Sequence, residues 1–356
     1  MDDRESAFNS ENSNDDETHA INQKKVVTIK DIANMLGLSV TTVSRAISGK
    51  GRIGDETKLR VFRLCDELNY RPNLLAKGLA NSRTYNIGVV LPADSNLTEI
   101  PFFQSCLLGI CETAASMDYD VVVTTITEDN ISLLKRLIDN HKVDGVVLTR
   151  SVVHDNAAAY LKEMGVPFVM IGSCEDDDII QVDSNHFGGC EELTSVLIRS
   201  GCSHFAFISG NQNHIVNRNR YFGYRKALES HQISENSRLT FFDAMTKPFI
   251  DHAVDVIMQR RTDCIICTDD LICSRVLARL DQMKYQVPED VKVASFYNST
   301  FLENHNPPIS ALNINVKELG SMAGKRLIEL IVHKEIPQKT LINYEILLKR
   351  STGGRL

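Results

Sequence analysis

The chain has no long hydrophobic run. None of its apolar stretches approaches the roughly 20 residues that a membrane-spanning helix needs. The N-terminal residues are acidic and lack the charged-then-apolar pattern of a secretion signal. We therefore expect a protein that works in the cytoplasm and has no membrane partner.

A disulfide or metal framework is also missing. The nine cysteines are an odd number, scattered through expected strands and helices, and no export signal accompanies them, so we expect reduced, mostly buried thiols. Cys264 and Cys267 have the spacing of a redox or metal motif, but no second Cys or His pair stands at zinc spacing. Residues three apart on a strand point to opposite faces, so we expect these two side chains to pack in a core.

Motifs for catalysis are absent as well. Gly188 and Gly189 lack the spacing and the lysine of a phosphate-binding loop, and His186 has no recognisable Ser or Cys nucleophile motif. The sequence therefore predicts no catalytic residue, no metal and no cofactor, and we do not expect an enzyme.

The composition is that of an ordinary soluble protein with several domains. With 43% hydrophobic residues in 356, the chain can bury large cores and should form two or three domains. Residues 1–23 are rich in Asp, Glu, Asn and Ser, which predicts a disordered acidic tail. The tail is either a solvated extension or a competitor of DNA for the basic segment that follows it.

Two short helices with a tight corner are predicted after the tail. Thr28 followed by Asp31 is a capping signal, so a helix should begin there and run to about Leu36. Gly37 permits the left-handed turn that ends this helix, and Ser39 offers the cap of a second one. The side chains expected between the two helices are Ile32, Ala33, Leu36, Leu38, Val43 and Ala46.

The second helix should present a polar face. Its outward residues are Val40, Thr41, Thr42, Ser44 and Arg45. This pattern is typical of a helix-turn-helix that reads DNA bases, although a small helical packing module could expose a similar face to solvent.

Charge distinguishes these two interpretations. Residues 24–83 hold twelve Lys and Arg against five acids, about +7 inside a chain of −7. Such local asymmetry favours binding to a phosphate backbone. A third helix follows, with Asp55 and Glu56 in its first turn, where acidic groups suit the helix dipole.

The same stretch resembles the headpiece of the lactose/galactose repressor (LacI/GalR) family. The matching motifs are Thr28-Ile-Lys-Asp-Ile-Ala, Thr42-Val-Ser-Arg and Asn69-Tyr-Arg-Pro-Asn-Leu-Leu-Ala-Lys-Gly-Leu79. The resemblance implies a helix-turn-helix domain at 24–71 and a hinge and linker at 72–85, which becomes helical on the operator and inserts Leu79 into the minor groove. The DNA-contacting residues that we predict are Thr28, Ser39, Val40, Thr41, Thr42, Ser44, Arg45, Arg52, Tyr70, Asn73, Ala76 and Leu79.

From Asn86 onward, short apolar runs alternate with amphipathic stretches. Buried parallel strands are expected at 87–91, 121–124, 146–148, 168–171, 205–208, 264–267 and 291–296. Strand-helix alternation predicts doubly wound parallel sheets, and the strands are too many for one ordinary sheet.

The resemblance extends over this region and implies a periplasmic-binding-protein-like pair of lobes, an α/β domain at 86–356. We expect the chain to cross between lobes near Asp183, Asn315 and Pro337. One lobe then holds about 86–183 and 315–336, and the other holds about 184–314 and 337–356.

An effector should bind in the cleft between the lobes, outside the carboxyl ends of the strands. Arg220 matches the position by which the family holds polar effector groups, although it could instead form an interlobe salt bridge. Asp269 would face the ligand. Tyr297 and Gly172 stand where sugar-responsive members often have Asp, which favours a flatter or less hydroxylated ligand. Phe102, Phe103 and Phe242 are either further apolar walls of the site or simply core.

Together these features predict a sequence-specific transcriptional regulator, usually a repressor in families of this kind. We expect a homodimer on a near-palindromic operator, switched by a small-molecule effector such as a sugar or related metabolite. The chain has no leucine-heptad tail, so a tetramer built that way is not expected. The rival interpretation is an enzyme or solute-binding protein of the same two-lobed shape, and the sequence leaves a protein co-regulator open.

Overall fold

The computed structural model describes residues 27–49, 51–71, 83–93 and 101–353. Contacts within the chain define two compact units, residues 1–77 and 78–356. The division falls inside the segment expected to be a hinge.

The first unit contains the predicted trio of helices, α1 (Ile29–Leu36), α2 (Val40–Ser48) and α3 (Asp55–Glu67). Thr28 and Asp31 form a full capping box at the start of α1, and Gly37 ends this helix in the left-handed conformation at φ 64°. Ser39 caps α2 by accepting a hydrogen bond from the Thr42 amide. The buried core consists of Ile32, Ala33, Val43, Ala46, Val61 and Cys65. The predicted capping and wedge residues are therefore confirmed.

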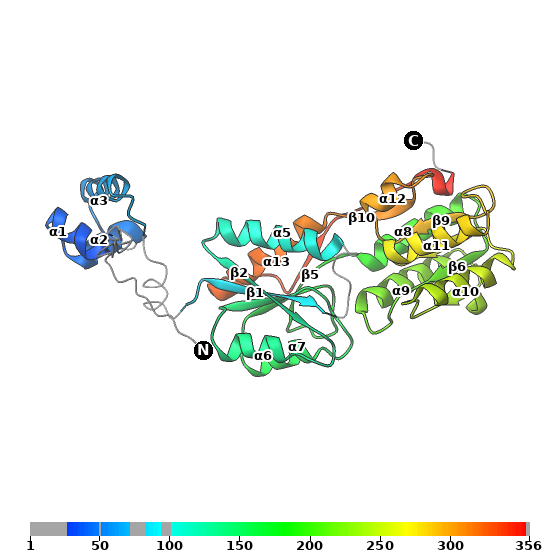
Figure 1. The fold of residues 1–356 in the computed structure, drawn as a ribbon, viewed down its shortest axis with the longest axis horizontal. Helices are drawn as coiled ribbons and strands as arrows, with labels where there is room; N and C mark the ends of the chain where they lie inside the picture. Colours follow the sequence, from blue (N-terminus) through cyan, green and yellow to red (C-terminus); the bar gives the residue numbers. More distant parts are fainter. Residues whose placement is uncertain (1–26, 50, 72–82, 94–100, 354–356) are drawn as a thin grey trace, which may run out of the picture. The chain divides into compact units, whose positions relative to one another are not determined.

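The first lobe of the second unit is built on a six-stranded parallel sheet of order β11-β5-β4-β3-β1-β2. Figure 1 shows α5 and α13 on one face of this sheet and α6 and α7 on the other. The strands are β1 (Asn86–Pro92), β2 (Asp120–Ile126), β3 (Gly145–Leu148), β4 (Phe168–Ile171), β5 (Ile180–Ser184) and β11 (Lys339–Ile342). The helices are α5 (Pro101–Ser116), α6 (Ser132–Asp139), α7 (Asn156–Glu163) and α13 (Val316–Ile331).

The second lobe has a six-stranded sheet of order β12-β10-β9-β8-β6-β7. Its edge strand β12 runs antiparallel to β10, so this sheet is mixed rather than wholly parallel as expected. The strands are β6 (Phe205–Ile208), β7 (Thr240–Phe241), β8 (Cys264–Cys267), β9 (Lys292–Ser295), β10 (Ser310–Ile314) and β12 (Tyr344–Leu347). The helices are α8 (His186–Arg199), α9 (Ile215–Ser230), α10 (Lys247–Met258), α11 (Asp270–Gln282) and α12 (Thr300–Asn304), with 3₁₀ turns at Ser237–Leu239 and Arg350–Thr352.

Apolar side chains fill both faces of the second sheet. One core joins the sheet to α8 and α9, and the other joins it to α10 and α11. Cys264 belongs to the first of these cores and Cys267 to the second, so the prediction that they pack on opposite faces of a strand is confirmed. All nine cysteines are free, and seven of them are buried.

Three segments connect the two lobes. β5 leads into α8 and β10 leads into α13, close to the crossings expected near Asp183 and Asn315. The third crossing lies at Asn343, between β11 and β12, and not at Pro337. The reason is that residues 339–342 pair in parallel with β5 and therefore still belong to the first lobe.

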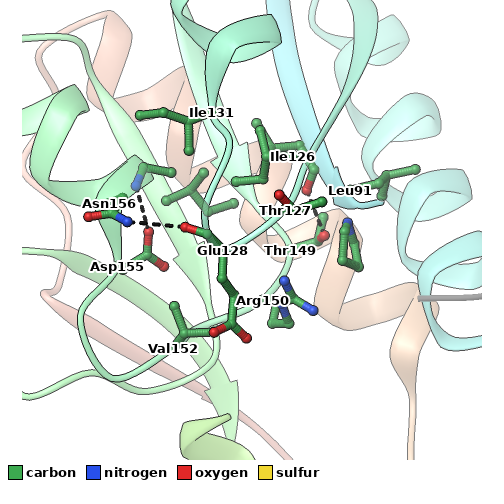
Figure 2. Close-up of a pocket in the computed structure, with 14 residues that line it drawn as sticks. Leu91, Ile126, Thr127, Glu128, Ile131, Thr149, Arg150, Val152, Asp155 and Asn156 are labelled. Atoms are coloured by element: carbon green, nitrogen blue, oxygen red, sulfur yellow. Dashed lines mark hydrogen bonds between the residues drawn. The ribbon is translucent and has the colours of Figure 1, made fainter. Parts of the chain in front are cut away.

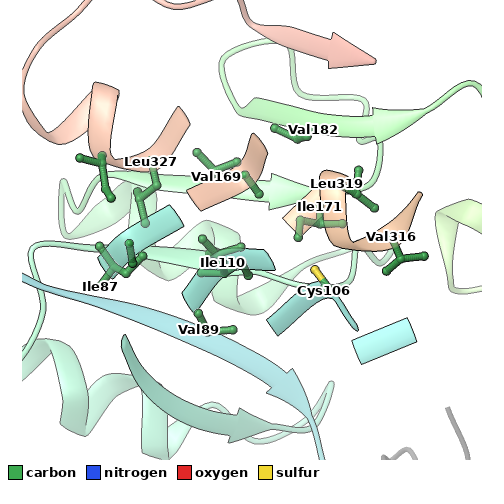
Figure 3. Close-up of a cluster of buried hydrophobic side chains, with 14 of the residues drawn as sticks. Ile87, Val89, Cys106, Ile110, Val169, Ile171, Val182, Val316, Leu319 and Leu327 are labelled. Carbon is green, nitrogen blue, oxygen red and sulfur yellow. The ribbon is translucent and has the colours of Figure 1, made fainter. Parts of the chain in front are cut away.

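The core of the first lobe packs β1, β4 and β5 against α5 and α13 (Figure 3). Gly109 on α5 and Gly320 on α13 allow the two helices to approach closely. A Cβ atom added at Gly320 would overlap the carbonyl oxygen of Cys106, and one added at Gly109 would overlap that of Lys317. Within the described parts of the chain, no helix is both long and apolar enough to span a bilayer.

Candidate functional site

In the first unit, the outer face of α2 matches the expectation. Thr41, Ser44 and Arg45 are exposed, and so is 40% of Val40. Thr42 is half-buried, and its amide and hydroxyl lie 3.0 and 2.8 Å from Ser39 Oγ. α2 therefore offers a rigid row of short polar side chains ending in a guanidinium, which suits the major groove.

The remaining residues predicted to contact DNA differ in their surroundings. The Thr28 hydroxyl lies 2.7 Å from Asp31 Oδ2, so it serves the cap of α1. Arg52 is exposed, whereas Tyr70 packs partly buried against the headpiece core. Asn73, Ala76 and Leu79 lie outside the described residues.

In the second unit, a cavity of about 230 Å³ lies between the two lobes. We call it the cleft cavity. Of the residues predicted to bind an effector, those that line it are Phe102, Phe103, Arg220, Asp269 and Tyr297. The Phe102 ring from α5 meets the Tyr297 ring from the second lobe edge to face, with centroids 6.2 Å apart. The cavity therefore has an aromatic wall to which both lobes contribute.

Phe242 has a different place from the one predicted. It does not line the cleft cavity, and its ring packs edge to face on Tyr221 with centroids 4.9 Å apart. The reason is the alternation of side chains at β7: Phe241 faces the core beside α10 and α11, and Phe242 faces the core beside α8 and α9.

Arg220 is the most deeply placed cation of the cleft cavity, with 7% of its surface exposed. Its Nη1 donates to the carbonyl oxygen of Thr268 at 2.9 Å, which holds the side chain against the end of β8. Its Nε is buried and has no hydrogen-bond partner among the described residues. No carboxylate of the described chain lies within salt-bridge distance of it, so the interlobe salt bridge considered for Arg220 is not formed here.

Asp183 and His186 form a buried pair at the junction of β5 and α8. His186 Nε2 lies 3.3 Å from Asp183 Oδ1, and Asp183 Oδ2 accepts a hydrogen bond from Ser173 Oγ at 2.6 Å. Burial opposes the charged carboxylate, but His186 and the hydrogen bonds from Ser173 and Ser184 outweigh it and lower the pKa of Asp183. Burial lowers the pKa of His186, so the imidazole is neutral near pH 7.

The other acidic groups of the cavity wall are also engaged. Asp269 caps α11, because its Oδ1 accepts from the Ile272 amide at 2.8 Å. Burial raises the pKa of both Asp269 and Asp270, and it raises the pKa of the Tyr297 phenol above its ordinary value. Asp269 thus has a hydrogen-bond partner within the protein, whereas Arg220 Nε and His186 Nδ1 have none among the described residues.

Sequence reasoning missed several residues of the cavity wall. They include Thr149, Arg150, Ser151, Asp183, His186, His214, Asn217, Asp270 and Arg275. Part of this set was detectable: Asn217 lies one helical turn before Arg220 on α9, so both face the same side. His186 had no such signal, because it is an isolated residue at a helix start. No cluster of three or more potential metal ligands occurs among the described residues.

A second, smaller hollow lies at the carboxyl ends of β1, β2 and β3 (Figure 2). Its volume of about 30 Å³ is close to the share of one water molecule, so it does not accommodate a metabolite. Glu128 on its rim contacts the second lobe. Its carboxylate accepts a hydrogen bond from Asn213 Nδ2, and Oε1 lies 3.4 Å from His214 Nε2. Val152 and His214 form an isolated β-bridge beside them.

A helix-turn-helix unit joined to two doubly wound lobes around a cavity of apolar and polar side chains defines a class of protein: a DNA-binding regulator with a periplasmic-binding-protein-like ligand domain. Family models agree. Residues 28–73 match the bacterial regulatory proteins of the lacI family, and residues 194–352 match a periplasmic binding protein-like domain. The HTH-type transcriptional regulator MalR of Streptococcus pneumoniae is 31% identical over 342 residues, which cover 91% of this chain and 99% of that protein. The chain belongs to the LacI family of bacterial transcriptional regulators.

Solved structures show the same architecture. A complex of the transcriptional regulator CelR with cellobiose is 26% identical, with a TM-score of 0.69 over 91% of this chain and 99% of that one. The lac repressor dimer bound to operator and the anti-inducer ONPF has a TM-score of 0.73 at 20% identity, over 92% of this chain and 99% of that one, and supports the fold alone. The predicted family, fold class and function as a DNA-binding transcriptional regulator are thus confirmed. The relatives are named as regulators and not as enzymes.

Proposed function

We propose that this chain is a cytoplasmic repressor that binds a near-palindromic operator as a homodimer and is switched by a small carbohydrate-like effector in the cleft cavity. The observation that carries this proposal is the cleft cavity itself, whose wall holds a buried guanidinium without a carboxylate partner among the described residues. The names of MalR and of the CelR–cellobiose complex support a sugar as the class of effector.

The domain organisation that we propose follows from this function. Residues 1–23 form an acidic tail, 24–71 bind DNA, 72–85 join the domains, and 86–356 bind effector and hold the dimer together. The structure moves the last expected crossing to Asn343, so the first lobe takes residues 339–342.

A dimer is required by the size of the DNA-binding unit. α2 is 9 residues long and exposes few side chains that can reach base edges. Two copies joined through the second unit would read two half-sites and gain the specificity that one lacks. The effector side chains come from both lobes, so a ligand that changes the angle between lobes would also change the spacing of the two DNA-binding units.

The volume of the cleft cavity suits a small metabolite. About 230 Å³ corresponds to several water molecules at ~30 Å³ each. The aromatic wall of Phe102 and Tyr297 offers a flat apolar surface, and Arg220 offers donors opposite polar groups. A sugar ring presents both kinds of surface.

Selection of bound DNA tests this function. Genomic fragments retained by the full-length protein should share an inverted repeat, and their neighbouring genes should indicate the pathway of the effector. Arg45→Ala should abolish retention, whereas Arg238→Ala, an exposed arginine of the second lobe, should retain the same fragments. Retention of fragments without a shared sequence would contradict the proposal.

A further inference from the structure

Two buried polar atoms of the cleft cavity have no hydrogen-bond partner among the described residues. They are Nδ1 of His186, at the start of α8, and Nε of Arg220, on α9. Both side chains are more than nine-tenths buried, with 8% and 7% of their surface exposed, and both line the cleft cavity. A buried polar atom without a partner costs free energy, so each needs a group that the protein itself does not supply.

The fold holds the two side chains near one another. α8 and α9 approach so closely that a Cβ added at Gly223 would overlap the carbonyl oxygen of Phe187. Gly223 lies one turn after Arg220, and Phe187 directly follows His186. Arg220 also acts on His186 electrostatically. Burial is the main cause that lowers the pKa of His186, and the positive charge of Arg220 lowers this pKa as well.

The hydrogen-bonding character of each atom follows from its neighbours. His186 Nε2 lies 3.3 Å from the charged carboxylate of Asp183, so Nε2 carries the proton and donates it. Nδ1 of the neutral ring is then a lone-pair acceptor. Arg220 Nε can only donate. The cavity wall therefore holds an unused acceptor on α8 and an unused donor on α9, two helices that approach each other closely.

We propose that His186 Nδ1 and Arg220 Nε together read one hydroxyl group of the effector, which makes His186 a specificity-determining residue for neutral polyhydroxylated ligands. The hydroxyl oxygen accepts from Arg220 Nε–H, and the hydroxyl hydrogen is donated to His186 Nδ1. A carboxylate or phosphate oxygen has no hydrogen to donate, so it would face the Nδ1 lone pair. This inference rests on the proposed effector site.

Other charges of the wall do not favour an anion over a neutral ligand. Arg150 and Arg275 also line the cleft cavity, but so do Asp183, Asp269 and Asp270. The donor and acceptor pair favours a ligand group that can both accept and donate a hydrogen bond. A hydroxyl does both, whereas a carboxylate or phosphate oxygen only accepts.

Matched ligands test this pairing on the full-length protein. Neutral mono- and disaccharides, among them glucose, maltose and cellobiose, are compared with glucuronate and glucose 6-phosphate by thermal shift and titration calorimetry. We expect at least one neutral sugar to raise the melting temperature more than glucuronate or glucose 6-phosphate does. Equal or greater stabilisation by an anionic member, or no stabilisation by any neutral sugar, would overturn the inference. DNA selection would still test the proposed function separately.

Two substitutions test whether His186 recognises the ligand or only packs within the protein. His186→Gln keeps a donor that can reach Asp183 but removes the Nδ1 acceptor, and we expect it to weaken binding of the stabilising sugar about 5- to 100-fold. His186→Asn places an acceptor near the Nδ1 position and should bind within about threefold of the parent. Both should retain operator fragments in a gel shift. Unchanged sugar affinity in His186→Gln, or an equal loss in both variants, would leave His186 with a packing role only.

Discussion

At the scale of single residues, Arg220 is a buried cation whose Nε has no hydrogen-bond partner among the described residues. Burying a guanidinium is costly unless it is paired and hydrogen-bonded, and within the described parts of the chain only the Thr268 carbonyl accepts from it. A fold tolerates such a group where a ligand completes its partners. This is a physical reason, independent of any family motif, for placing the effector at Arg220.

Replacing Arg220 should therefore separate the two functions of the chain. We expect Arg220→Ala to keep operator affinity and to weaken binding of the stabilising sugar by about 2–5 kcal/mol, because a buried charged donor is lost. Calorimetry gives the sugar affinity and fluorescence anisotropy gives the operator affinity. Arg238→Ala, on the exposed 3₁₀ turn Ser237–Leu239, serves as the control. A normal response of Arg220→Ala to the sugar would rule out this role.

Recognition of DNA bases also depends on single residues. Thr41 is exposed in the first turn of α2, and its hydroxyl takes no part in the Ser39 cap. Thr41→Ala should relax the preference at one or two base pairs by about 1–3 kcal/mol, because direct readout is local. Binding-site selection measures this, with Ser48→Ala at the end of the same helix as control. An unchanged consensus for Thr41→Ala would remove Thr41 from the reading face.

At the scale of elements, the close approach of α5 and α13 fixes the outer layer of the first lobe. Gly320 leaves no room for a Cβ beside Cys106, whereas a Cβ at Gly324, one turn later, would make ordinary contacts of 3.5 Å with Ile110. The two glycines therefore differ in function although they share a helix.

Alanine substitutions should reveal this difference. We expect Gly320→Ala to lower the free energy of unfolding by about 1–3 kcal/mol through overpacking. Gly324→Ala should be neutral or stabilise by up to about 1 kcal/mol, because Ala favours a helix over Gly. Urea unfolding measures both. Equal effects of the two substitutions would contradict the tight crossing of α5 and α13.

The elements also show how far sequence reasoning reached. The first helix of the first unit and the start of the second could be placed closely, because Thr28, Gly37 and Ser39 carry local signals that the structure bears out. Strands made only of apolar residues, such as β8, could also be predicted, because their signal lies in the local sequence. β5 and β10 were missed because they mix apolar residues with Gln181, Asp183 or Asn313. The antiparallel edge strand β12 depends on a partner far away in the sequence, which local patterns do not encode.

The residues of the candidate site also differ in whether the local sequence indicates them. Residues that follow strand ends, such as Asp269 and Tyr297, could be placed in the cleft because ligands bind at the carboxyl edge of parallel sheets. Phe242 follows a strand too, but it turns to the opposite core. His186 carries no motif, and its importance appears only when its neighbours Asp183 and Arg220 are known.

At the scale of the whole molecule, the effector must act through the two lobes. Glu128 of the first lobe contacts Asn213 and His214 of the second; of these three residues only His214 lines the cleft cavity. Hydrogen bonds to charged groups contribute about 1.5–3 kcal/mol each, so this contact helps to hold the lobes together. A ligand that binds this joined arrangement of the lobes binds more tightly, because the Glu128 contact already stabilises the arrangement.

Removal of Glu128 should weaken ligand binding, although Glu128 itself does not line the cleft cavity. We expect Glu128→Ala to lower sugar affinity about tenfold, because less of the protein occupies the joined arrangement that binds. Asp129→Ala, the exposed neighbour, should bind like the parent. Calorimetry gives the affinities, and small-angle scattering should show a larger radius of gyration for Glu128→Ala without sugar. Identical affinity and radius in all three proteins would show that the contact does not control closure.

The central claim is that the cleft cavity and the DNA-reading helix are coupled. Linkage requires that a sugar which changes operator affinity by some factor has its own affinity changed by operator by the same factor. The decisive measurement is the affinity of the full-length protein for a selected operator fragment with and without saturating sugar, and for the sugar with and without operator. We predict equal factors in the two directions, about 5- to 150-fold, and their loss in Arg220→Ala. A sugar that binds in the cleft and leaves operator affinity unchanged would contradict the account.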